Sequence, residues 1–86
     1  METEKNIFDE LVGMILNYYP ELKGKPLTMD TAISGQAGVD SLGFIFVVAK
    51  LENRYNIKIS NHQVKKLVTL GDVVRLVESK TKHHHD

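Results

Sequence analysis

Residues 40–56 read DSLGFIFVVAKLENRYN, and this stretch decides the fold. Asp40 and Ser41 are both good N-cap residues, and Asn56 tolerates the left-handed conformation that ends many helices. At about 100° per residue, one arc about 100° wide collects the apolar side chains of a core stripe. These are Phe44, Val47, Val48, Leu51 and Tyr55. We therefore expect a helix from Asp40 or Ser41 to about Tyr55.

The same helix has a second apolar face. Leu42, Phe46 and Ala49 fall roughly opposite the core stripe, and Ile45 lies at its border. In one explanation, the long loop before the helix folds back over Leu42, Ile45 and Phe46. In the other, the face is a docking patch for other proteins, in which a phenylalanine is an effective anchor. The residues leave both explanations open.

A first helix and a long loop are expected ahead of this one. Apolar residues from Asn6 to Tyr19 recur at three- and four-residue spacings, and Pro20 closes the pattern. Residues 20–40 then hold two prolines and three glycines among scattered apolar residues, which predicts an ordered loop. Loops of this length are unusual in small domains and are commonly functional.

Two more helices are expected towards the end of the chain. Ser60 or Asn61 caps a short helix through Lys66. Residues 69–72, TLGD, resemble a capping box and open a last helix through Ser79. Three longer helices, one short third helix and a long loop between the first two predict an all-α four-helix bundle.

The domain is expected to span residues 1–79, with residues 80–86 as a disordered polar tail. The three histidines at positions 83–85 are compatible with a weak metal site, a shortened purification tag or a native tail. We favour a disordered tail, and no metal site is predicted.

Length and composition restrict the function. A chain of 86 residues forms one small domain, which excludes most stand-alone enzymes. The absence of cysteine removes disulfides, thiolate nucleophiles and thiolate zinc sites, and it fits a reducing compartment, so we expect the cytoplasm. The longest apolar run, from Phe44 to Ala49, is far too short to span a membrane.

The net charge is zero but unevenly distributed. Residues 1–40 carry seven acidic and three basic side chains, a net charge of minus four. Residues 41–68 carry one acidic side chain, Glu52, and five basic ones, a net charge of plus four. The five are Lys50, Arg54, Lys58, Lys65 and Lys66. Because only one of them is arginine and the chain has no overall basic excess, no nucleic-acid partner is predicted.

Ser41 does not fit a catalytic nucleophile. Val39 occupies the position where a nucleophile elbow has glycine, and no strand is expected before the serine. Outside the tail the only histidine is His62, so no catalytic triad is predicted. Two roles remain for Ser41. It is a helix N-cap, or it accepts a phosphate-linked group, because the amides and dipole at a helix N-terminus favour an anion.

These residues resemble the acyl carrier protein family, which includes peptidyl carrier domains, from Ile7 to about Val77. The core of the match is GVDSL at residues 38–42, followed at the family's spacing by the segments 51–59 and 69–73. The resemblance implies a bundle of acyl-carrier-protein type in which Ser41 carries 4′-phosphopantetheine through a phosphodiester. A separate magnesium-dependent phosphopantetheinyl transferase installs this arm from coenzyme A. Its thiol then holds acyl or aminoacyl groups as thioesters, so the protein is a carrier and not an enzyme.

The resemblance also implies roles for residues near Ser41. Asp40 matches the family's preceding aspartate, which helps to present the serine and the metal in the transferase complex. The family's partner-recognition helix includes the second apolar face: Leu42, Ile45, Phe46 and Ala49. The implied partners are the transferase, an enzyme that loads the acyl or aminoacyl group, and downstream synthase or transferase enzymes. A monomer that binds no membrane is expected.

The chain departs from typical fatty-acid carriers, whose acidic second helix docks onto basic synthase surfaces. Here residues 41–68 are net basic, Gly43 replaces a common aspartate, and Phe46 stands where an acid is often found. We therefore expect a discrete carrier in a specialised polyketide, nonribosomal-peptide or fatty-acid-like pathway, with partners that present apolar or acidic surfaces. The alternative is a carrier-like bundle that acts as an unmodified protein-interaction module.

Overall fold

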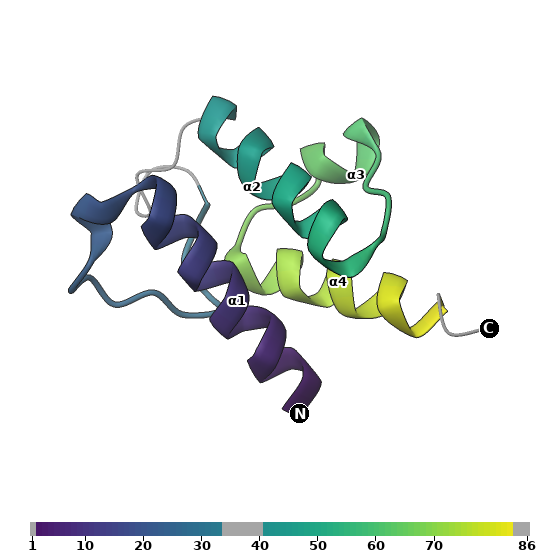
Figure 1. Cartoon of the computed structure of the whole chain (residues 1–86), viewed down its shortest axis with the longest axis horizontal. Coiled ribbons are helices and arrows are strands. Elements are labelled where there is room, and N and C mark those ends of the chain that lie inside the picture. The colour runs from purple at the N-terminus through teal and green to yellow at the C-terminus, as the bar shows by residue number, and fades with distance from the viewer. Residues whose placement is uncertain (1, 34–40, 84–86) are drawn as a thin grey trace.

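The computed structural model describes residues 2–33 and 41–83, and within them the chain is helical. The α-helices are α1 (Glu2–Tyr18), α2 (Ser41–Tyr55), α3 (Asn61–Lys65) and α4 (Leu70–His83), and a short 3-10 helix, η1 (Pro20–Leu22), follows α1. The only extended pairing among these residues is an isolated bridge between Ala32 and Thr69. Figure 1 shows the three longer helices and the short α3, which confirms the predicted four-helix fold.

The core lies among α1, α2 and α4. α1 packs against both other helices, and α2 packs against α4. The predicted stripe on α2 is confirmed, because Val47, Val48 and Leu51 are buried while Phe44 and Tyr55 are partly buried against the core. α3 contains no buried residue and lies at the outside of the bundle.

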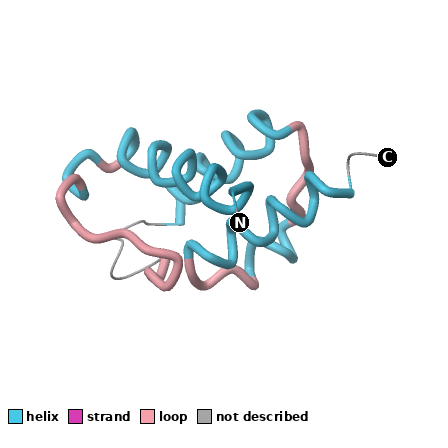
Figure 2. Tube along the Cα trace, turned by 90° about the horizontal axis from the view of Figure 1, so that it is seen from below, coloured by secondary structure: helices cyan, strands magenta, loops and turns pink. Residues whose placement is uncertain are grey.

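The described part of the long loop is tied to the start of α4, and Figure 2 shows it running back from the end of α1. The Ile33 N–H donates to the Val68 carbonyl at 2.8 Å, and the Gly71 N–H donates to the Met29 carbonyl at 2.8 Å. A Cβ at Gly71 of α4 would lie 2.9 Å from that same carbonyl oxygen, so the close approach of the loop to α4 requires glycine at this position. An ordered loop is thus confirmed for residues 20–33, and residues 34–40 lie outside the described part.

Side-chain caps define α3 and α4 as the sequence predicts. The Ser60 hydroxyl accepts a hydrogen bond from the Gln63 N–H at 3.1 Å, and the Gln63 side chain accepts one from the Ser60 N–H at 3.0 Å. At α4 the Thr69 hydroxyl accepts from the Asp72 N–H at 3.2 Å, and the Asp72 carboxylate accepts from the Thr69 N–H at 3.1 Å. Asn56 ends α2 with a φ of 55°, the left-handed conformation expected of it.

Both outer helices are longer than predicted. α1 begins at Glu2, ahead of the expected Asn6, because acidic residues suit a helix's first turn. α4 continues beyond Ser79 to His83, so the prediction of a disordered tail is wrong for residues 80–83. No glycine or proline follows Ser79, and lysines are favourable in a last helical turn. Residues 84–86 lie outside the described part.

Candidate functional site

Ser41 is the first residue of α2, so its backbone lies at the amino end of a helix of 15 residues. Figure 1 places this end of α2 at the edge of the molecule. The first-turn amides of a helix point out of its amino end, which is also the positive end of the helix dipole. Asp40 lies outside the described residues, as do the side chains of Ser41 and Leu42. The backbone therefore places Ser41 where an attached anion is favoured.

The first turn of α2 is fixed against the end of α1 by Tyr19 and Gly43. A Cβ at Gly43 would collide with the hydroxyl and ring of Tyr19, so the tyrosine side chain lies directly on the glycine. Tyr19 is itself partly buried against the core, and its N–H donates to the Ile15 carbonyl at 2.8 Å. In the sequence Gly43 stands out only as a departure from the family, because no local pattern pairs it with a residue so distant in the chain.

The second face of α2 is exposed. Ile45 is 57% exposed and Phe46 51% exposed, and Ala49 is also exposed. The explanation in which the loop folds back over this face is therefore wrong for Ile45 and Phe46. It stays untested for Leu42, whose side chain lies outside the described part.

Phe46 is partly engaged within the protein. Its ring stacks on Tyr18 of α1, with ring centroids 5.9 Å apart and an interplanar angle of 17°. Nothing in the local spacing of either helix indicates this pair, which joins two helices. One side of the Phe46 ring therefore contacts α1, although half of the residue remains accessible.

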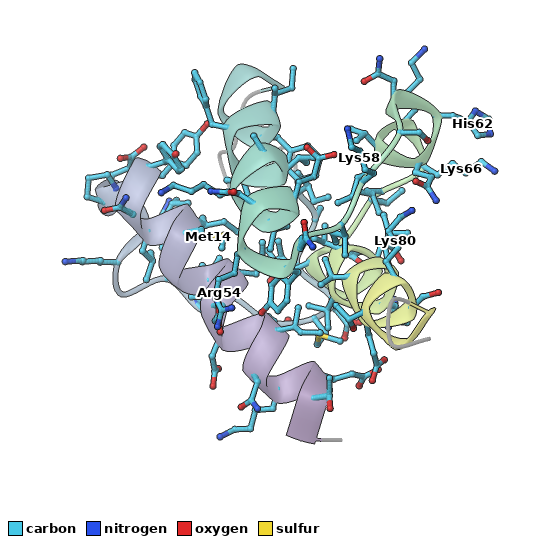
Figure 3. All side chains as sticks on the ribbon, turned by 45° about the vertical axis from the view of Figure 1, so that its right-hand side comes forward. Met14, Arg54, Lys58, His62, Lys66 and Lys80 are labelled. Atoms are coloured by element: carbon cyan, nitrogen blue, oxygen red, sulfur yellow. The ribbon has the colours of Figure 1, made fainter. Side chains whose placement is uncertain are left out.

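Between α1 and α2, an open hollow of about 500 Å³ is lined by Met14 and by an ion pair between Glu10 and Arg54. The Arg54 guanidinium donates to the Glu10 carboxylate, with N–O distances of 2.8 and 2.9 Å. The same guanidinium lies 5.2 Å from the centre of the Tyr55 ring. Burial, followed by the negative charge of Glu10, raises the pKa of Tyr55 above its usual value. Figure 3 shows Met14 and Arg54 on this side of the bundle.

A second hollow, of about 340 Å³, lies between α2 and α3. Its lining is Ile45, Val48, Ala49, Glu52, Ile59, Asn61, Val64 and Lys65. The Glu52 carboxylate accepts a hydrogen bond from the Ile59 N–H at 2.8 Å, which fastens the α2–α3 link to α2. Two residues of the predicted recognition face, Ile45 and Ala49, thus border this hollow.

Within residues 2–33 and 41–83, no group of three or more histidine, aspartate or glutamate side chains is placed to hold a metal ion. His62 is exposed on α3, far along the chain from Ser41. None of the helices in the described part has the length and apolar character needed to cross a membrane.

Comparison with known proteins defines the class. The family model described as "Phosphopantetheine attachment site" matches residues 12–77. The chain is 42% identical to an acyl carrier protein of Helicobacter pylori over 72 residues, covering 84% of this chain and 91% of that protein. It is 33% identical to an acyl carrier protein of Wolinella succinogenes over 76 residues, covering 85% of this chain and 95% of that one. The class is therefore that of carriers with a phosphopantetheine attachment site.

The fold agrees with this class. A crystal structure of an acyl carrier protein from Thermotoga maritima superimposes with a TM-score of 0.71 at 17% identity, covering 91% of this chain and 94% of that one. The chain belongs to the acyl carrier protein family. It is a carrier with a covalent 4′-phosphopantetheine group and not an enzyme, as the resemblance implied.

Proposed function

We propose that Ser41 is the attachment residue, and that the chain holds acyl or aminoacyl groups on this arm and presents them to partner enzymes. The supporting observation is the place of Ser41 as first residue of α2. Two other serines fall within the matched residues 12–77. Ser60 uses its hydroxyl to cap the short α3, and Ser34 lies outside the described part. Ser41 alone among the described serines of this range begins a long helix.

The chemistry available at this end of α2 suits the group. A serine hydroxyl supplies the oxygen of a phosphodiester, and the helix amides and dipole stabilise its negative charge. As the Ser41 oxygen bonds to the phosphate that carries the pantetheine, the pyrophosphate P–O bond of coenzyme A breaks and its adenosine bisphosphate part leaves, while the hydroxyl proton passes to the transferase. We assign Asp40, the neighbour of Ser41, to presenting the serine and metal in that complex. When bound, the arm supplies a terminal thiol on which cargo is held as a thioester.

The proposed partner-recognition face lies on the same helix as Ser41: Leu42, Ile45, Phe46 and Ala49. Its support is the exposure of Ile45 and Phe46. Adjacent exposed apolar side chains of this size are typical of a surface that binds a partner. Partners would be the phosphopantetheinyl transferase, the loading enzyme and downstream synthase or transferase enzymes. We propose that the chain acts as a cytoplasmic monomer in a specialised polyketide, nonribosomal-peptide or fatty-acid-like pathway.

Intact mass spectrometry tests the attachment residue. The full chain is incubated with coenzyme A, Mg²⁺ and a promiscuous phosphopantetheinyl transferase, beside the Ser41→Ala and Ser60→Ala variants. We expect one phosphopantetheine on the wild type and on Ser60→Ala, and none on Ser41→Ala. A mass gain on Ser41→Ala would overturn the assignment. Absence of any gain on the folded wild type with several transferases would favour the unmodified interaction module.

A further inference from the structure

The structure separates the positive charges of residues 41–68 into two groups. Arg54 faces α1, where the Glu10 carboxylate neutralises it at 2.8 Å. The lysines at 58, 65 and 66 lie around α3, and no ion pair in the described part of the chain includes them. Figure 3 shows Lys58 and Lys66 on one side together with His62 and Lys80, away from Met14 and Arg54. We call the four lysines on this side the α3 cationic face: Lys58, Lys65, Lys66 and Lys80.

The acidic side chains near this face are already engaged. The Glu52 carboxylate accepts the Ile59 N–H at 2.8 Å. The Asp72 carboxylate accepts the Val68 and Thr69 N–H groups at 3.0 and 3.1 Å, and it also pairs with Arg75 at 3.1 Å. Neither carboxylate pairs with Lys58, Lys65 or Lys66, so these lysines are available to a partner, whereas Glu52 keeps its negative charge at the edge of the face.

A largely apolar hollow adjoins the lysines. Ile45, Ala49 and Val64 line the space of about 340 Å³ between α2 and α3, and the same lining holds three polar side chains: Glu52, Asn61 and Lys65. Ile45 is 57% exposed beside it. A recess that takes an apolar side chain, with ammonium groups next to it, is complementary to an apolar residue flanked by carboxylates.

We propose that this face docks an acidic amphipathic helix of a partner protein, with an apolar side chain in the hollow and carboxylates on the α3 lysines. The inference rests on the proposed function, because a partner seated here lies along the helix that begins at Ser41. A nucleic acid fits less well. The charged side chains of the face are lysines, without arginine, and none of the described residues that line the hollow is aromatic, so bases have nothing there to stack on.

Titration of the isotope-labelled full chain, followed by NMR amide shifts, tests the proposal. The probes are two short helical peptides with the same leucine face, one flanked by glutamates and the other by lysines. We expect the glutamate peptide to shift the amides of Ile45, Ala49 and Val64, with weaker binding as salt is raised. The lysine peptide should bind at least about tenfold more weakly.

Two double variants that replace lysines by glutamates, one on the α3 cationic face and one far from it, provide a matched comparison of peptide affinity. The Lys65→Glu/Lys66→Glu variant should lose at least about tenfold in affinity for the glutamate peptide. The Lys23→Glu/Lys25→Glu variant has the same net charge but alters the turn after η1, at the opposite end of the molecule from α3, and should bind as the wild type does. Lys58→Glu, outside any helix, gives a second test should the double variant lose α3.

Three outcomes would overturn the proposal. These are equal affinity for both peptides, shifts confined to the α1–α2 side around Met14 and Arg54, and tighter binding to a single-stranded oligonucleotide or an anionic phospholipid vesicle than to the glutamate peptide. The Ser41→Ala variant keeps the two proposals apart. It should bind the glutamate peptide normally although it accepts no arm, so a failure of attachment and a failure of docking are distinguishable.

Discussion

The two apolar faces of α2 are built from the same kinds of residue and have opposite fates. Val47 and Leu51 are 0% exposed against α1 and α4, whereas Ile45 and Phe46 are more than half exposed on the other side. Burial of apolar area stabilises a fold, while an exposed apolar patch is available to a partner. Stability and recognition therefore reside on different sides of one helix, and single substitutions should separate them.

The largest contrast is expected between Leu51→Ala and Ile45→Ala. Removing a fully buried leucine side chain leaves a cavity and should lower the free energy of unfolding by about 3 kcal/mol. Truncating the exposed Ile45 should cost less than about 1 kcal/mol. Chemical denaturation followed by circular dichroism measures both values. Equal losses would mean that the exposed face also supports the fold.

The next effect concerns the first turn of α2, where Tyr19 lies on Gly43. Gly43→Ala should lower the free energy of unfolding by about 2 kcal/mol, because the new methyl group displaces the tyrosine side chain. Gly13 of α1 provides the matched glycine. A Cβ there meets no atom within 4 Å, so Gly13→Ala should stabilise the protein by about 1 kcal/mol.

A double-mutant cycle checks the cause of the Gly43 effect. In a Tyr19→Leu background the methyl group has more space, so the cost of Gly43→Ala should fall. A cost that is the same in both backgrounds would show that the tyrosine does not fix this turn.

Phe46 should contribute more to stability than Ile45 on the exposed face and less than Leu51 on the buried face. Because its ring stacks on Tyr18 at 5.9 Å, Phe46→Ala should lower the free energy of unfolding by about 1 kcal/mol, more than an exposed residue alone would. Thermal denaturation of Phe46→Ala, Tyr18→Ala and the double variant gives the coupling energy. Additive losses would place Phe46 with the purely exposed residues.

Local rules were enough to predict most of the fold. Apolar spacing located the buried stripe of α2, and cap chemistry located the starts of α3 and α4 at Ser60 and Thr69. Each of these signals involves residues within a few positions of one another. The outer ends of α1 and α4 were predicted less well, because at those positions weak preferences decide where a helix stops.

Contacts between distant segments could not be predicted in this way. Glu10 and Arg54 are 44 positions apart, and only the packing of α1 on α2 brings their side chains together. The same packing creates the Tyr19 contact with Gly43, and the position of α3 makes a hollow beside Ile45. The start of α2 at Ser41 followed from the sequence, but the exposure of its second face depended on where the loop lies.

The smallest expected effect is a pH dependence of the free energy of unfolding, caused by Tyr55 at the carboxyl end of the buried stripe of α2. Burial raises the pKa of Tyr55, with a further contribution from the negative charge of Glu10. Above the usual tyrosine pKa of about 10, the unfolded chain ionises Tyr55 more readily than the folded chain does. Its contribution to stability is therefore fully present below that pH and is lost as the pH rises through the folded pKa.

The Tyr55→Phe variant tests this prediction. Its side chain cannot ionise, so the difference in unfolding free energy between wild type and variant should change in this alkaline range and stay constant near neutral pH. A difference that does not change with pH would mean that Tyr55 titrates as it does in water, and that the buried face of α2 opens to solvent at its end.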